Sequence, residues 1–277
     1  MIAAELIFAC GWAMIKLAGS KLPVFEVVFF RASLSLIILT GIMLWRGSSF
    51  KGRNHRLLFL RGLFGFGGIA TSFVAMIKMN LGNASILLNT FPLFVALLAP
   101  VLIGERFRRI NFIFVIVAFV GIGLIMKPTH HIFHNVALLG LLSGIFAALS
   151  VLCVRRLTLT DSSSVITFYF TMFTTICAIP FAVSEFIMPT KIEWLLLVGI
   201  GTAVTVGQLL MTRAYSHAKA ATISPFAYIS VLGAYMFGII IWNDVPDLLS
   251  VIGGVLIVAT GIAITISEGR VEPQPPA

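Results

Sequence analysis

Long apolar runs separated by short polar breaks make up nearly the whole chain. A membrane-spanning helix needs about 20 mostly apolar residues, because the bilayer's hydrocarbon core is about 30 Å thick and a helix rises about 1.5 Å per residue. Ten segments meet this requirement: residues 1–19, 23–44, 57–78, 83–103, 110–126, 134–154, 165–187, 193–213, 221–242 and 248–266. The pattern therefore predicts an all-α integral membrane protein with ten transmembrane helices and no separate soluble domain.

Composition excludes the other classes of protein. Apolar residues make up 59% of the chain and charged residues 10%, and the mean hydropathy is +1.08. A soluble domain usually carries about 25% charged residues, and a disordered chain needs low hydrophobicity. The three cysteines all lie inside apolar runs, which indicates neither a disulfide framework nor a zinc site.

The net charge of +9 is concentrated in short clusters between the apolar runs. This pattern favours cytoplasmic loops that face anionic lipid over a surface that binds nucleic acid. With both termini in the cytoplasm, four basic residues fall on the outer side, and thirteen fall on the cytoplasmic side: Arg46, Lys51, Arg53, Arg56, Arg61, Arg106, Arg108, Arg109, Arg155, Arg156, Arg213, Lys219 and Arg270. The bias predicts a multi-pass protein of the cell inner membrane with both termini cytoplasmic.

The second half of the chain weakly repeats the first. Lys78 and Arg213 end corresponding helices, and Glu105 corresponds to Asp244. Residues 118–125 are matched to residues 258–265. Each half holds five spans, an odd number, so the second half must cross the membrane in the opposite orientation. Inverted repeats of this kind are typical of secondary transporters, whose midplane site opens alternately to each side.

Five short motifs, taken in order along the ten spans, resemble one known family. They are residues 25–31 (FEVVFFR), 61–63 (RGL), 92–94 (PLF), 104–106 (GER) and 121–123 (GIG). In these motifs the chain is similar to the drug/metabolite transporter superfamily, EamA type. Within that family, residues 25–31 and the region from Tyr235 to Asp247 look most like S-adenosylmethionine uptake carriers.

The resemblance implies ten helices in a five-plus-five inverted repeat around a central cavity. The expected domains are a first EamA repeat at 1–127, a second at 134–267 and a disordered cytoplasmic tail at 268–277. The expected function is secondary transport of a small organic metabolite, such as an amino acid or S-adenosylmethionine, by alternating access through exchange or gradient-driven flux. Efflux of metabolites or drugs by the same fold stays an open alternative, as do, from other classes, a channel and an intramembrane enzyme.

Arg31 is the most informative candidate for substrate binding. It lies about 12 Å into the second span, by a rise of about 1.5 Å per residue. An arginine at a helix centre costs about 2.5–3.5 kcal/mol, so we expect its side chain to face protein or a watery cavity. Its guanidinium can bind a substrate carboxylate or phosphate. It can equally tie the fold to helix-end carbonyls or to Glu26.

Two further pairs of candidates come from the repeat and from a helix break. Lys78 and Arg213 occupy corresponding helix ends, where they can snorkel to the headgroups or serve as alternate gates. Asn89 and Pro92 lie near the middle of the fourth span, where proline removes a backbone donor. Such a break is tolerated where it lines a cavity, although a kink needed only for packing is an equal alternative.

Four more residues combine polar groups with flat or aromatic surfaces. Trp12, Gln208, Tyr228 and Tyr235 can line a cavity for a flat or cationic solute by stacking and hydrogen bonding. Helix packing or anchoring at the membrane interface is the alternative interpretation for each.

The sequence predicts no catalytic residue, metal site or cofactor. It holds no P-loop for ATP and no H-E-x-x-H motif for an intramembrane metalloenzyme. His130, His131 and His134 cluster in one connection and are interpreted as solvated loop residues. No acidic residue falls at a helix centre, which disfavours a proton carrier built around a midplane acid. The expected partners are a small-molecule substrate and the lipid bilayer, without nucleic acid, and a homodimer is left open.

Overall fold

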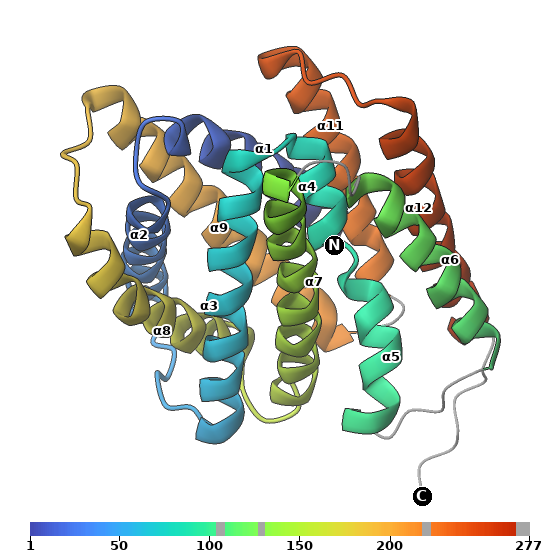
Figure 1. Cartoon of the computed structure of the whole chain (residues 1–277). Helices are drawn as coiled ribbons and strands as arrows, with labels where there is room; N and C mark the ends of the chain where they lie inside the picture. The colour runs from blue at the N-terminus through green and yellow to red at the C-terminus, as the bar shows by residue number, and fades with distance from the viewer. Residues whose placement is uncertain (104–108, 127–130, 218–222, 270–277) are drawn as a thin grey trace, which may run out of the picture.

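The computed structural model describes residues 1–103, 109–126, 131–217 and 223–269, and every regular element within these ranges is helical (Figure 1). The helices of the first half are α1 (Ile2–Gly19), α2 (Val24–Trp45), α3 (His55–Lys78), α4 (Leu81–Leu88), α5 (Phe91–Ile103) and α6 (Arg109–Met126). Those of the second half are α7 (His131–Leu157), α8 (Ser163–Ser184), α9 (Lys191–His217), the short 3₁₀ helix η1 (Ser224–Ala227), α11 (Tyr228–Trp242) and α12 (Leu248–Gly269).

The helices follow the predicted spans, with two differences. The predicted span 83–103 is broken into α4 and α5, and the predicted span 221–242 contains η1 followed by α11. Among the described residues, seven segments are long and apolar enough to cross a membrane, and three shorter apolar helices lie at Ile116–Ile125, Tyr228–Trp242 and Leu248–Ala263. The predicted tail begins inside α12, which continues to Gly269, and its remaining residues lie outside the described ranges.

Local polar residues explain where several helices begin and end. The Asn54 side chain accepts a hydrogen bond from the Leu57 amide at 3.2 Å, and so caps α3. Thr190 and Glu193 form a reciprocal capping box before α9, since each side chain accepts from the other residue's amide. Asn243 ends α11 in the left-handed conformation with φ of 54°, which asparagine tolerates better than most residues. These caps satisfy backbone groups that lipid would leave unpaired.

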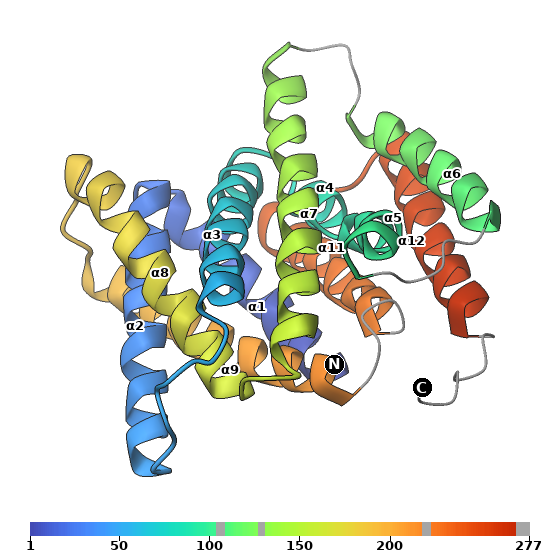
Figure 2. The ribbon, with the colours of Figure 1, turned by 90° about the horizontal axis from the view of Figure 1, so that it is seen from below.

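Most of the packing joins a helix of the first half to a helix of the second half. α2 packs on α8 at one end of the molecule and α6 packs on α12 at the other, with the remaining helices between these pairs (Figures 1 and 2). In between, α1 packs on α9 and α3 packs on α7. If the two halves are exchanged, so that α1 and α7 swap places and α3 and α9 swap places, the pair of α1 with α9 becomes the pair of α7 with α3. The pairs of α2 with α8 and of α6 with α12 each map onto themselves. The helix contacts are therefore two-fold symmetric.

The symmetry is reciprocal at the crossing of α6 and α12. A Cβ added at Gly121 would lie 2.7 Å from the carbonyl oxygen of Gly253, and one added at Gly253 would lie 2.5 Å from that of Gly121. Ile257 approaches the first glycine as Ile125 approaches the second. The two backbones touch where only glycine fits, so Gly121 and Gly253 are equivalent positions. The sequence match of residues 118–125 with 258–265 was therefore wrong in register, by about two helical turns.

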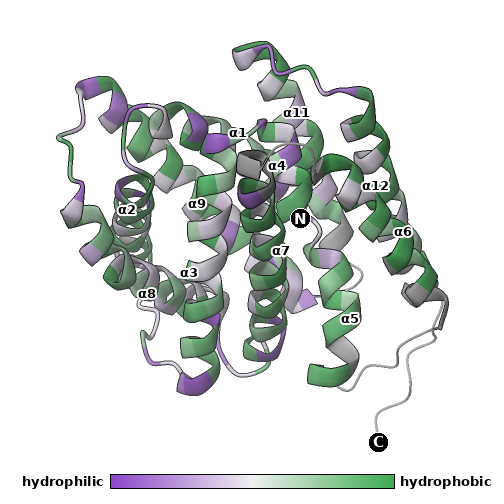
Figure 3. Ribbon diagram, in the orientation of Figure 1, coloured by the Kyte–Doolittle hydropathy of each residue, from purple (hydrophilic) through white to green (hydrophobic). Residues whose placement is uncertain are grey.

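The outer faces of the helices carry large apolar side chains. Leu195 on α9, Leu232 and Ile240 on α11 and Val255 on α12 are all exposed. Figure 3 shows hydrophobic residues along the lengths of the helices and hydrophilic residues mainly near their ends and in the connections. A water-soluble protein rarely exposes so much contiguous apolar surface, so these faces suit contact with lipid.

Candidate functional site

A cavity of about 160 Å³ lies at the centre of the helices. Its walls come from α1, α2 and α3 of the first half, from α7, α8 and α9 of the second, and from the break between α4 and α5. Six aromatic residues contribute to the lining, namely Phe8, Trp12, Phe64, Phe73, Phe91 and Phe170. Three charged residues, Glu5, Arg31 and Arg61, interrupt this otherwise largely apolar surface.

Arg61 is the charged residue of the cavity that the structure fixes most firmly. Its Nη1 donates to the Ser150 hydroxyl at 2.6 Å, and its Nη2 donates to the Gln208 side-chain oxygen at 3.3 Å. The guanidinium lies 3.8 Å from the centroid of the Phe170 ring, a cation–π contact. Gly65, one turn further along α3, leaves the space that this side chain occupies, since an added Cβ would overlap Arg61 Nη1.

Arg61 was predicted to lie with the basic residues of the cytoplasmic loops, and this prediction was wrong. Arg61 lies within α3, is 4% exposed and lines the cavity. The signal in the sequence is the pair of glycines after Arg61, Gly62 and Gly65, which allow a long side chain to fold along the helix face. Without Arg61, twelve basic residues still favour the cytoplasmic side against four on the outer side.

Arg31 faces the same cavity from α2 with less support. It is 5% exposed, and its Nε and Nη1 atoms have no hydrogen-bond partner among the described residues. The nearest aromatic support is Phe73, whose ring centroid lies 5.8 Å from the guanidinium carbon. No ion pair with Glu26 is formed among the described residues, and one oxygen of the Glu26 carboxylate accepts a hydrogen bond from the Ile187 amide at 3.0 Å.

The break between α4 and α5 reaches the cavity through Asn89. The Asn89 amide group donates to the Ser85 carbonyl at 2.8 Å, and the Thr90 hydroxyl donates to the Leu87 carbonyl at 2.7 Å. Gly144 on α7 lets that helix approach the break, since an added Cβ would lie 2.9 Å from the Leu87 carbonyl oxygen. The interrupted backbone is thus buried in protein, as a break at membrane depth requires.

The structure brings together four of the nine sequence-predicted candidates. Arg31, Asn89, Gln208 and Trp12 all line the cavity. Glu5 was not predicted to belong with them, although it lies inside the first span, is 3% exposed and faces the same space. Ser150 was also missed, because a serine in an apolar run carries no distinguishing pattern.

The other five candidates lie outside the cavity lining. Pro92 is buried in the first turn of α5, and Tyr228 is buried in an apolar cluster to which α4, α5, α6, α7, α11 and α12 contribute. Lys78 and Arg213 are exposed near the ends of α3 and α9. Tyr235 donates a hydrogen bond to the Asn83 side-chain oxygen at 2.9 Å, and so joins a second polar group at one end of the molecule.

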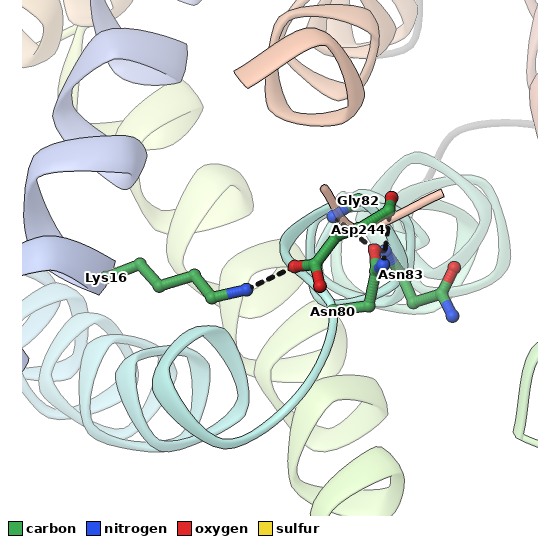
Figure 4. Close-up of polar contacts among 5 residues, drawn as sticks. All are labelled: Lys16, Asn80, Gly82, Asn83 and Asp244. Atoms are coloured by element: carbon green, nitrogen blue, oxygen red, sulfur yellow. Dashed lines mark hydrogen bonds and ion pairs between the residues drawn. The ribbon is translucent and has the colours of Figure 1, made fainter. Parts of the chain in front are cut away.

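This second group, the polar end cluster, consists of Lys16, Asn80, Asn83, Tyr235, Asp244, Asp247 and Ser250. Lys16 Nζ lies 2.6 Å from Asp244 Oδ2, and Asn80 Nδ2 donates to the Asp244 backbone carbonyl at 3.3 Å (Figure 4). Asn80 also caps α4 by accepting from the amides of Gly82 and Asn83. The cluster ties the ends of α1, α3 and α4 to the connection between α11 and α12.

An apolar layer separates the polar end cluster from the cavity. It contains Ala13, Met76, Leu81, Ala84 and Ala234, all buried, with Trp12 and Trp242 packed against them. Along α1, the cavity residues Trp12 and Ile15 precede Lys16, and along α3, Ser72 and Phe73 precede Asn80. Along both helices the apolar layer thus lies beside the cavity residues, and the Lys16–Asp244 pair lies in the polar end cluster beyond it.

These features define a polytopic α-helical membrane protein with a charged internal cavity. The sequence profile described as the EamA-like transporter family matches the chain twice, at residues 1–127 and 134–267. The chain belongs to this family. Its resemblance to drug/metabolite transporters is thereby confirmed. The motif at 104–106 and the side chains of the histidine cluster lie outside the described residues.

Several curated relatives cover nearly the full length of the chain. The pseudopaline exporter CntI of Pseudomonas aeruginosa is 34% identical over 95% of this chain and 94% of its own. The S-adenosylmethionine uptake transporter of Rickettsia bellii is 27% identical over 93% of this chain and 89% of its own. One solved crystal structure covers 98% of both chains with a TM-score of 0.68 at 18% identity, and so shares the fold. The relatives carry transporter names.

Proposed function

We propose that this protein is a secondary transporter that moves a small organic metabolite across the cell inner membrane by alternating access. The observation that carries the proposal is the central cavity, which residues of both halves enclose and into which Arg31, Arg61 and Glu5 face. Buried charges at membrane depth are rare and mark substrate or ion pathways. The family membership supports a transporter, and the cavity supports a site where a solute is held.

The proposed architecture is ten transmembrane helices in two five-helix repeats of opposite orientation. The seven long spans and three shorter apolar helices support this number. The two profile matches support repeats at 1–127 and 134–267. The symmetric helix pairs and the reciprocal contact of Gly121 with Gly253 support a two-fold relation between them. An odd number of spans in each repeat requires the inversion, and the remaining charge bias supports cytoplasmic termini.

In this orientation the polar end cluster lies on the outer side, because α1, α3 and α11 run outward to it. The conformation described is then closed to the outside by the apolar layer and the Lys16–Asp244 pair. Transport requires this end to open while the opposite end closes. Since most helix packing crosses between the repeats, rocking one against the other would change both ends together.

The direction of transport has two candidates. The relatives include an exporter, 34% identical, and uptake transporters, 27% identical or less. The higher similarity to the exporter favours efflux of a metabolite. Uptake of an amino acid or S-adenosylmethionine is the second candidate, and it is supported by the similarity to the uptake transporters. Exchange and gradient-driven flux use the same cavity in both cases.

Counterflow in proteoliposomes tests the proposed mechanism. The purified protein is first screened for thermal stabilisation by S-adenosylmethionine, amino acids, riboflavin and nucleotides. Vesicles are then preloaded with the unlabelled hit and mixed with a labelled trace outside. We expect the label to accumulate transiently above its equilibrium level, because a carrier exchanges one bound solute for another. Unitary ionic currents, or flux without any counterflow, would contradict the proposal and favour a channel.

A further inference from the structure

The connection between α2 and α3 carries a concentrated positive charge. Four basic residues, Arg46, Lys51, Arg53 and Arg56, lie between positions 46 and 56, and this stretch holds no acidic residue. All four are exposed, and within the described part of the chain none of their side chains forms an ion pair. We call these four residues the basic platform. Their combined charge favours a partner of negative charge.

The backbone and the apolar residues of this connection anchor it to the rest of the fold. The Ser48 amide donates to the Met43 carbonyl at 2.8 Å, and so turns the chain back at the end of α2. The Phe50 ring makes an edge-to-face contact with Phe168 of α8, with ring centroids 5.1 Å apart. Gly52 is buried. The basic side chains are therefore presented from a fixed backbone, which lowers the entropy lost when a partner binds.

The acidic residue Asp161, in the connection between α7 and α8, binds the backbone of this stretch and not its cations. Its Oδ1 accepts a hydrogen bond from the Arg53 amide at 2.6 Å, and its Oδ2 accepts one from the Thr160 hydroxyl at 2.6 Å. The two connections lie side by side at the same end of the molecule (Figure 1). The contact thus joins the basic platform to the second half of the chain without an ion pair to its side chains.

Large apolar side chains are exposed on both sides of the basic platform. Leu44 and Trp45 end α2 and are 66% and 84% exposed, and Phe59 near the start of α3 is 56% exposed. Tryptophan is enriched at the level of lipid headgroups. A basic stretch bordered by exposed apolar side chains matches an amphiphile with an anionic headgroup and apolar chains. A soluble phosphate would leave these apolar side chains uncovered.

We propose that the basic platform binds the headgroup of an anionic phospholipid, whose acyl chains lie against Leu44, Trp45 and Phe59. The proposal goes beyond transport and takes from the proposed function only the orientation, in which α2 ends and α3 begins at the cytoplasmic leaflet. Anionic lipids give that leaflet a negative surface potential, and each lysine or arginine near it strengthens binding about fivefold. Because Asp161 joins the platform to the second half, a bound lipid would also stabilise the contact between the halves.

Binding of defined lipids to the purified full chain tests the proposal. The probes are dioleoyl phosphatidylglycerol, dioleoyl phosphatidylcholine and sn-glycerol 3-phosphate, which keeps the phosphate but lacks acyl chains. Native mass spectrometry counts bound lipids, and thermal unfolding in a neutral detergent measures stabilisation. We expect phosphatidylglycerol to bind and to raise the melting temperature, phosphatidylcholine to bind at least about tenfold more weakly, and glycerol phosphate to have no effect. Added salt should weaken the binding of phosphatidylglycerol.

A matched pair of variants separates the basic platform from net charge. R46Q/R56Q removes two positive charges and leaves the backbone contact of Arg53 unchanged. It should weaken the binding of phosphatidylglycerol at least about tenfold, since each cation contributes about fivefold. K21Q/K191Q removes two positive charges from exposed positions elsewhere, before α2 and at the start of α9, and should bind phosphatidylglycerol as the wild type does.

Trp45 provides a readout that a general effect of charge would not change. Phosphatidylglycerol with brominated acyl chains, added in an excess of ordinary phosphatidylcholine, should quench the tryptophan fluorescence of the wild type. W45F should lose most of this quenching, because the other three tryptophans lie in α1, α9 and α11, outside the proposed lipid site.

Several outcomes would overturn the proposal. They are equal binding of phosphatidylglycerol and phosphatidylcholine, equal losses in R46Q/R56Q and K21Q/K191Q, and the same quenching in W45F as in the wild type. Binding of sn-glycerol 3-phosphate as tight as that of phosphatidylglycerol would replace the lipid with a soluble phosphate. Failure of counterflow with the lipid results intact would reject the proposed function alone. Counterflow without selectivity for the anionic lipid would reject only the lipid site.

Discussion

Lys16 and Asp244, separated by 228 positions in the sequence, form an ion pair of 2.6 Å between the two halves of the chain. The Lys16 ammonium group also lies 4.7 Å from the centroid of the Trp242 ring. The side chains are 12% and 27% exposed, so the pair lies at the boundary between the apolar layer and the surface. It joins the end of α1 to the connection that follows α11.

Breaking this pair should open that end of the cavity more often. A cysteine at Ser72, which lines the cavity, reports this opening by reacting with a membrane-impermeant maleimide from the outer side. K16Q or D244N should raise its labelling rate by up to about fivefold, since a partly exposed pair contributes about 1 kcal/mol or less. The measurement needs a background in which Cys10, Cys153 and Cys177 are replaced by alanine.

A charge swap provides the control for the gate. The double variant K16D/D244K should return the labelling rate of the Ser72 cysteine toward that of the unaltered pair, because the attraction is restored in reverse. If both single variants label at the original rate, the pair does not hold this end closed. If the double variant labels as fast as the singles, the effect belongs to the individual side chains.

The crossing of α6 and α12 should tolerate no side chain. G121A and G253A should each lower the melting temperature clearly, because the added Cβ would meet a backbone carbonyl of the opposite helix at 2.7 or 2.5 Å, and a backbone cannot move aside as a side chain does. Overpacking of this kind costs about 1–3 kcal/mol. Thermal unfolding in detergent measures the effect.

Gly123 is the matched control on the same helix. No heavy atom lies within 4 Å of a Cβ added there. G123A should therefore be neutral or stabilising by up to about 1 kcal/mol, because alanine is the better helix former. Equal melting temperatures for G121A and G123A would contradict the described crossing.

Substitution of Gly65 should act by displacing the Arg61 side chain and not by a clash with backbone atoms. A Cβ at this position would overlap Arg61 Nη1 and the Phe170 ring, both of which are side-chain atoms that can shift. G65A should consequently keep the fold but displace the guanidinium, and lower the affinity for a solute held at Arg61 about tenfold. G41A, in open space on α2, is the control and should bind normally. Normal binding by G65A would mean that the position of Arg61 is unimportant.

Asn80 combines two roles that substitution can separate. Its side-chain oxygen caps α4, and its side-chain nitrogen donates to the Asp244 carbonyl. N80A should lower the free energy of unfolding by about 1 kcal/mol, as loss of an N-cap does. N80S should recover most of that stability while still lacking the amide donor. In the N80S variant the cysteine at Ser72 should therefore react with the maleimide from the outer side faster than it does without the substitution. An unchanged melting temperature for N80A would contradict the capping role.

The helices could be located from sequence because their apolar runs are long and their breaks short. The predicted span 134–154 and helix α7 (His131–Leu157) differ by only three residues at each end. The break between α4 and α5 was harder, since Asn89 and Pro92 show that a kink occurs but not that the chain leaves the helix at Asn89 and Thr90. That detail depends on how closely α7 approaches through Gly144, a tertiary contact without a local pattern.

The composition of the cavity was only partly predictable. Arg31 stood out because an arginine deep in an apolar run needs an explanation. Arg61 did not, because it follows a basic loop and its burial depends on the space that Gly65 leaves and on the ring of Phe170, far away in sequence. Likewise Lys16 pairs with Asp244, a partner that only the packing of the two halves supplies.

The opposed orientation of the two halves is the claim on which the account depends most. It is tested by placing one reporter cysteine within residues 104–108, between α5 and α6, and another within residues 243–247, between α11 and α12, and labelling each in intact cells with an impermeant reagent. We predict that the reporter at 243–247 reacts from outside the cell and that the reporter at 104–108 reacts only after the membrane is permeabilised. Reaction of both from the same side would contradict the inverted architecture, and with it alternating access between the two repeats.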